Sequence, residues 1–193
     1  MASVDAKLAA YRAKRDFART HEPSGRDHRA AGRRFVIQQH AARRMHYDFR
    51  LEQDGVLLSW AVPKGPSLSP KQRRLAVRTE DHPLDYVDFE GVIAKGEYGG
   101  GSVSVWDRGT WQPEGDAAAA LAAGKLTFQL EGAKLRGGWH LVRTKPQGGK
   151  EAWLLFKARD ALADDELDII AAEPASVISG RTIEEIADEL PAR

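Results

Sequence analysis

The sequence predicts a mainly β protein, built as a compact antiparallel β-barrel of about eight strands with a few short flanking helices. From residue 33 onward, short runs rich in β-branched and aromatic residues recur, separated by Gly, Pro and Asp. About eight such runs between residues 33 and 158 suit a closed or nearly closed barrel, or else a sandwich. The 193 residues, 42% of them hydrophobic, are enough for one domain with a core.

Eight segments are predicted as strands because they are short, apolar or alternating, and bounded by turn residues. They are residues 33–39, 46–52, 56–62, 74–79, 101–107, 125–130, 138–144 and 152–158. Residues 53–55, Gln-Asp-Gly, link the second strand to the third as a hairpin, with Asp-Gly supplying the turn.

Three helices are predicted outside these strands. Over residues 4–17, the apolar residues Val4, Leu8 and Tyr11 recur at helical spacing. The alanine-rich segment 116–123 indicates a brief helix that begins with an Asp cap and ends before a Gly. In the last helix, TIEEIADEL, Thr182 is the predicted cap and its capping-box partner is a Glu three residues later.

These elements divide the chain into three parts. Residues 1–32 form an N-terminal helix and basic arm, residues 33–158 the β-barrel core, and residues 159–193 an acidic tail with a short helix. We expect no membrane span, because there is no apolar run near 18 residues, and no signal peptide. Cysteine is absent, which suits a reducing cytoplasm and excludes thiolate metal sites.

The net charge of +1 hides an asymmetry along the chain. Residues 1–50 carry 12 Lys and Arg against 5 Asp and Glu, whereas residues 151–193 carry 4 against 11. A basic N-terminal quarter suits a phosphate-rich partner such as nucleic acid. The alternative is that the two ends attract each other or are simply solvated.

The segment HYDFRLE alternates polar and apolar residues, which predicts a strand with two different faces. His46, Asp48 and Arg50 share one face, and Tyr47, Phe49 and Leu51 share the other. A slip of one residue would bury the charged side chains, so the apolar face fixes the register.

Imidazole and carboxylate groups two residues apart on one face can converge on a divalent metal ion. His40, at the end of the preceding strand, could complete a set of His40, His46 and Asp48. Three protein ligands with open positions are typical of a catalytic metal, and Arg50 beside them suits a phosphate. The same pattern also occurs on the solvated face of an ordinary amphipathic strand.

Two loops add candidate residues. In EDHPLDY, His82 could act as a general acid or contact a phosphoryl group, and Tyr86 could donate a hydrogen bond to substrate; His82 could equally cap a turn. In PKGP, Lys64 could lie over a phosphate or be solvated in a plain turn. The glycine-rich segment 96–103 lacks a Walker lysine, so close backbone packing at a turn is expected there instead.

Three phrases together, HAARRMHYDFRLE, WAVPKGPS and EDHPLDY, make the chain resemble the 3′-phosphoesterase module of bacterial DNA ligase D. The resemblance extends from the phrase KRDF to SVISGRTIEEIA. It implies a compact β-barrel enzyme that uses Mn²⁺, or another divalent transition metal, during non-homologous end joining. The reaction that it implies removes a terminal 3′-ribonucleoside and then hydrolyses the remaining 3′-phosphate to a 3′-hydroxyl.

The resemblance also implies roles for individual residues. The metal ligands are His40, His46 and Asp48, and the residues that contact the scissile phosphate are Arg50 and His82. Positions that matter for one or both steps are Lys64, Arg74 and Tyr86, and those in the KRDF arm that shape the site are Arg15, Asp16 and Glu22.

The implied partners are DNA 3′ ends, above all a primer-template that ends in a 3′-ribonucleotide or a 3′-phosphate. Ligase and polymerase domains, in cis or in trans, and Ku are further implied partners, in the bacterial cytoplasm at the nucleoid. The chain is then either a stand-alone homologue or one domain of a larger protein. Two other classes fit parts of the pattern: a non-catalytic nucleic-acid-binding barrel, and a hydrolase of small phosphate esters.

Overall fold

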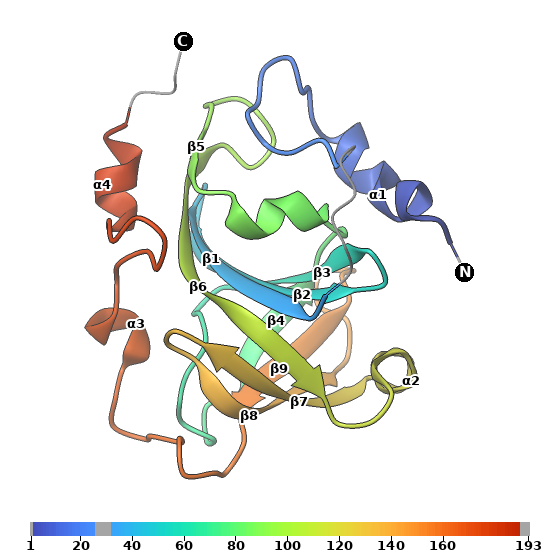
Figure 1. The fold of residues 1–193 in the computed structure, drawn as a ribbon, viewed down its shortest axis with the longest axis vertical. Helices are drawn as coiled ribbons and strands as arrows, with labels where there is room; N and C mark the ends of the chain where they lie inside the picture. The colour runs from blue at the N-terminus through green and yellow to red at the C-terminus, as the bar shows by residue number, and fades with distance from the viewer. Residues whose placement is uncertain (1, 26–31, 190–193) are drawn as a thin grey trace.

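The computed structural model describes residues 2–25 and 32–189. Its strands form one antiparallel sheet, and eight of them close into a barrel because β1 pairs with both β2 and β6 (Figure 1). The predicted mainly β barrel of eight strands is therefore confirmed. The strands are β1 (Arg34–Ala41), β2 (Met45–Gln53), β3 (Val56–Val62), β4 (Arg74–Arg78), β5 (Gly91–Ile93), β6 (Gly101–Pro113), β7 (Lys125–Gly132), β8 (Arg136–Arg143) and β9 (Ala152–Lys157).

The barrel closes in the order β1-β2-β3-β4-β9-β8-β7-β6, and β5 adds to the free side of β6. The sequence pattern missed β5, which has three residues and lies in an acidic stretch. Because neighbouring strands are antiparallel, the end of β1, the start of β2, the end of β3 and the start of β4 lie at the same end of the barrel.

Large aromatic side chains fill the barrel. Phe49 of β2 stacks on Phe128 of β7 with ring centroids 6.0 Å apart, and it packs on Trp60 of β3 at 6.1 Å. The apolar face of β2 thus points inward, as its alternation predicts. Its polar face, with Asp48 and Arg50, must point outward.

The strand β6 is long because it changes neighbours partway along. It pairs with β1 up to Thr110 and with β7 from Gly109 onward. A Cβ atom at Gly109 would lie 1.9 Å from the carbonyl oxygen of Glu131, so two backbones approach here as only glycine permits.

We expect Gly109→Ala to lower the free energy of unfolding by about 3 kcal/mol, because the β6 and β7 backbones must separate to admit the methyl group. Urea denaturation measures the change. The matched control is Thr110→Ala, at an exposed position on the same strand, which should cost much less. Equal stabilities for the two variants would contradict this account of the crossing.

Short helices flank the barrel: α1 (Val4–Ala13), α2 (Ala117–Ala123), α3 (Ile169–Ala172) and α4 (Ile183–Ala187). Figure 1 shows α1 and α4 on opposite sides of the barrel. As predicted, Asp116 caps α2 and Thr182 forms a capping box on α4, whereas α3 was not predicted. None of the described helices is long and apolar enough to span a membrane.

The helix α1 ends four residues earlier than the spacing predicts, at Ala13 instead of residue 17. The chain then turns, and α1 packs with the 3-10 helix η1 (Leu84–Asp88) on the outer face of the barrel. A second apolar cluster forms there, made of Tyr11, Val36, Leu57, Leu84, Tyr86, Val87 and Val105. This cluster covers part of the outward face that carries the polar residues of β1 and β2.

Candidate metal centre and phosphate site

The register between β1 and β2 brings the three predicted metal ligands together. His40 is the cross-strand partner of His46, and Gln38 is the partner of Asp48. Partners across antiparallel strands point to the same face, so all these side chains lie on the outside of the barrel. One nitrogen from each histidine and one oxygen of Asp48 all lie within 4.8 Å of one another, a spacing that could hold a metal ion.

Backbone carbonyls orient both imidazole rings. His40 Nε2 lies 2.7 Å from the Gly99 carbonyl, and His46 Nδ1 lies 3.0 Å from the Arg44 carbonyl. A carbonyl only accepts hydrogen bonds, so these two nitrogens carry the protons. The opposite nitrogens, those that could reach a metal ion, face Asp48, and each lies 3.5 Å from Asp48 Oδ2. Metal-ligating histidines are held in this way by outer partners.

Asp48 is buried, with 7% of its surface exposed, yet it is held in the charged form. Burial alone would raise its pKa. The charge of Arg50 and hydrogen bonds from His40 and His46 outweigh burial and hold the pKa well below its usual value. For His46, burial lowers the pKa, but the hydrogen bond and charge of Asp48 raise it overall. The carboxylate is therefore ready to serve as an anionic ligand.

Arg50 lies beside this set with one nitrogen unpaired. Its Nη2 lies 3.3 Å from Asp48 Oδ2, and its Nε donates to Gln38 Oε1 at 2.8 Å. Its guanidinium also lies 4.9 Å from the ring centroid of Tyr86. The buried Nη1 has no hydrogen-bond partner among the described residues. A fixed cation with an unsatisfied donor next to a metal-ligand set is suited to a phosphate oxygen.

Sequence reasoning missed Gln38, which fixes Arg50. Its amide nitrogen donates to the carbonyls of Tyr86 and Phe89, both at 2.9 Å, so its oxygen is left to accept from Arg50. The one available signal was its outward position on β1, two residues before His40. Sequence reasoning also missed the carbonyl of Gly99 as a partner of His40. The close backbone packing expected in that glycine-rich loop is present.

His82 is buried near Arg50, whose charge acts on its ring. Its Nδ1 lies 2.9 Å from the Glu80 carbonyl and therefore carries a proton, while its Nε2 lies 3.5 Å from Arg15 Nη2. Burial, and then the charges of Arg50 and Arg15, lower its pKa well below the usual value. The ring is therefore neutral, and its Nε2 can accept a proton or a hydrogen bond.

The arm after α1 supplies a buried ion pair to the same region. Arg15 Nε donates to Glu22 Oε1 at 2.8 Å, with both side chains almost fully buried. The Tyr86 hydroxyl donates to the same carboxylate oxygen at 2.8 Å. Burial and the charge of Glu22 raise the pKa of Tyr86 well above its usual value, so the hydroxyl keeps its proton.

Asp16 lies apart from this network. It is exposed, and its carboxylate accepts from the Ala18 amide at 3.0 Å, while its carbonyl accepts from the amides of Arg19 and Thr20. It therefore shapes the turn that returns the chain from Arg15 toward Glu22. Two arginines of the predicted basic arm, Arg26 and Arg29, lie outside the described residues.

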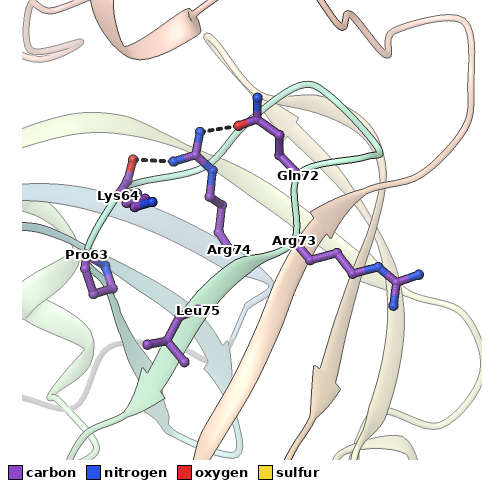
Figure 2. A pocket seen from close by; sticks show the side chains of 6 residues that line it. All are labelled: Pro63, Lys64, Gln72, Arg73, Arg74 and Leu75. Carbon is purple, nitrogen blue, oxygen red and sulfur yellow. Dashed lines mark hydrogen bonds between the residues drawn. The ribbon is translucent and has the colours of Figure 1, made fainter.

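Lys64 and Arg74 meet at the same barrel end as the metal-ligand set (Figure 2). Arg74 Nη1 donates to the Lys64 carbonyl at 3.2 Å, and Arg74 Nη2 donates to Gln72 Oε1 at 2.6 Å. With Arg73, these residues line a surface hollow of about 480 Å³. Lys64 is exposed, and Figure 2 shows its carbonyl oxygen, not its ammonium, joined to Arg74 by a hydrogen bond. The geometry provides a cationic surface at the same end of the barrel as the ligand set.

Comparison with known proteins identifies a matching family. The family model described as the DNA ligase D 3′-phosphoesterase domain matches residues 38–143. The chain is also similar to proteins named as multifunctional non-homologous end joining proteins LigD. The one from Pseudomonas aeruginosa is 54% identical over 181 residues, which cover 91% of this chain and 22% of that protein.

Two mycobacterial relatives show the same pattern. LigD of Mycolicibacterium smegmatis is 41% identical, covering 89% of this chain and 24% of that protein. LigD of Mycobacterium tuberculosis is 43% identical, covering 82% and 21%. The chain thus spans less than a quarter of the length of each of these relatives. It belongs to the DNA ligase D 3′-phosphoesterase domain family.

Proposed function

We propose that the chain is a metal-dependent phosphoesterase that repairs DNA 3′ ends. It removes a 3′-terminal ribonucleoside, which leaves a 3′-phosphate, and then hydrolyses that phosphate to a 3′-hydroxyl that a ligase can seal. One observation carries the proposal: the ligand atoms of two histidines and one aspartate converge, at a spacing that could hold a metal ion, beside a buried arginine that has an unpaired donor.

His40, His46 and Asp48 would hold the ion. Two imidazole nitrogens and one carboxylate oxygen suit Mn²⁺, and they suit other divalent transition metals as well. A bound ion of this kind supplies a Lewis acid for the phosphate and lowers the pKa of coordinated water. The carbonyls of Gly99 and Arg44 keep both rings ready for this role.

Arg50, His82 and Lys64 would hold the phosphate. Arg50 offers its unpaired Nη1, and Lys64 offers an exposed ammonium at the same barrel end. His82 is neutral with its Nε2 unprotonated, so this nitrogen can accept a hydrogen bond or a proton. A phosphate dianion beside the ring would favour its protonated form, which could then donate to the leaving 3′-oxygen.

The remaining predicted residues would position these groups. Arg15 and Glu22 anchor the arm and reach His82 and Tyr86, so they fix the wall of the site opposite β2. Asp16 would act through the turn that joins them, and Arg74 through its contact with the Lys64 backbone. We place the enzyme with ligase and polymerase domains, in cis or in trans, and with Ku, in the bacterial cytoplasm at the nucleoid.

The test is a labelled primer-template that ends in a single 3′-ribonucleotide, incubated with the protein and Mn²⁺ or a chelator. We expect a product shortened to a 3′-phosphate and later a 3′-hydroxyl product, both only with metal. No shortened or dephosphorylated product under any divalent metal would contradict the proposed function.

Two controls separate the competing classes. A non-catalytic nucleic-acid-binding barrel would bind the primer-template but leave its end intact with every metal. A hydrolase of small phosphate esters would cleave a nucleoside 3′-monophosphate as readily as the same phosphate on a DNA end. The proposed enzyme should prefer the DNA end, because a basic surface at the barrel end contacts further phosphates of the strand.

A further inference from the structure

A glycine-rich loop, residues 94–101, borders the candidate metal centre and exposes an aromatic ring. Tyr98 keeps 47% of its surface exposed and is one of five large apolar residues that are exposed among the described residues. The next residue, Gly99, supplies the carbonyl that orients His40. A single peptide bond therefore connects an exposed aromatic residue to the group that positions a candidate metal ligand.

Contacts with α1 and the arm fix this ring in place. Lys14 Nζ donates to the Tyr98 hydroxyl at 3.3 Å and lies 4.9 Å from the ring centroid. The Arg15 guanidinium lies 5.3 Å from the same centroid. Glu97, one residue before the ring, pairs with Arg19 at 2.9 Å and ties the loop to the arm. The ring thus presents a prearranged surface.

The two flanks of the centre differ in the groups that they offer to a DNA end. Beside Lys64, the hollow that contains Arg73 and Arg74 is cationic, and a continuing strand brings further phosphates that such a flank can neutralise. Beside Tyr98, the two cations nearest its ring are paired, Lys14 with Glu80 and Arg15 with Glu22, while Arg43 and Lys95 line a hollow along the same loop. A 3′-terminal nucleoside has a base but no phosphate beyond it, so it suits the flank that presents an exposed aromatic ring.

We propose that Tyr98 stacks on the base of the 3′-terminal nucleoside, the leaving group of the first step. The proposal rests on the function proposed above and names the residue that recognises this part of the substrate. Every nucleobase has a π face, so the contact would hold any of the four bases. It would contribute nothing to hydrolysis of a 3′-phosphate, where that nucleoside has already left.

The test compares three primer ends: a 3′-ribonucleotide, a 3′-terminal 1,4-anhydroribitol that keeps the 2′-hydroxyl but lacks a base, and a 3′-phosphate. We expect Tyr98→Ala to raise KM for the ribonucleotide end roughly tenfold or more. On the other two ends it should act like the unaltered protein. Tyr98→Phe, which keeps the ring and loses the hydrogen bond from Lys14, should retain activity on all three.

The outcomes separate a stacking role from a structural one. An equal loss on all three ends would overturn the proposal, because the ring would then act by covering Arg15. No loss on the ribonucleotide end would overturn it too, and would leave the proposed function standing. If the unaltered protein processes none of the ends with Mn²⁺, the proposed function and this inference both fall. Stabilisation of Tyr98→Ala by Mn²⁺ in thermal melting verifies that its metal site is intact.

Discussion

Replacing Asp48 by Asn is expected to weaken Mn²⁺ binding at least about a hundredfold and to lower kcat/KM on a 3′-ribonucleotide end roughly a thousandfold. Changing even an outer partner of a metal ligand typically costs 10- to 100-fold in affinity or activity, and Asp48 is the one anionic ligand of the set. Asn keeps the shape but removes the charge that faces His40, His46 and Arg50. Activity should not return at high substrate concentration.

Thermal melting provides a second measurement that does not depend on activity. At an Mn²⁺ concentration 100 times its dissociation constant, binding should stabilise the unaltered protein by about 2.7 kcal/mol. A hundredfold weaker site would leave about 0.4 kcal/mol at the same concentration. The control Asp5→Asn removes an exposed carboxylate from α1 and should keep both the shift and the activity. Full activity in Asp48→Asn would show that the ligand assignment is wrong.

Much of the barrel could be predicted from the sequence because strand alternation is strong where one face is buried. The inward residues of β2, such as Phe49, fixed its register, and the eight predicted strands are all present. Two features of the strands depend on how the barrel closes in three dimensions, and the sequence pattern did not predict them. β5 exists only because β6 has a free side, and β6 extends to Pro113 because it pairs with β1 and then with β7.

The site was only partly predictable for a related reason. His46, Asp48 and Arg50 share a strand, so their common face can be deduced from the sequence. The place of His40 depended on the cross-strand register, which pairs it with His46 across the connection 42–44. The contact between His40 and the Gly99 carbonyl cannot be predicted from residue types, because every residue has a backbone carbonyl.

The helix α1 shows a different limit. Tyr11 was identified as an apolar position of an amphipathic helix, and it is fully buried. Its ring also packs edge-on against His82, with centroids 4.9 Å apart, and its hydroxyl donates to the Pro23 carbonyl at 2.7 Å. A residue that forms the core of one helix contact is thus part of the wall around the site. The helical spacing of apolar residues predicts that Tyr11 is buried, but it does not predict that Tyr11 contacts His82.

Arg50→Lys is expected to lower kcat roughly 10²- to 10³-fold, as loss of a single oriented donor does at other active sites, while leaving Mn²⁺ binding intact. The guanidinium uses separate nitrogens for Gln38 and Asp48, and Nη1 is still free for substrate. The ammonium of a lysine keeps the positive charge, but it cannot contact Gln38, Asp48 and the substrate phosphate in these three directions at once. Single-turnover cleavage measures the loss, and the Mn²⁺ shift in melting temperature should persist.

Arg108→Lys, on a surface ion pair of β6, is the matched control and should change neither the cleavage rate nor the Mn²⁺ shift. A variant that lost the metal shift along with activity would instead place Arg50 among the groups that assemble the ligand set, and unchanged turnover would remove it from the phosphate site.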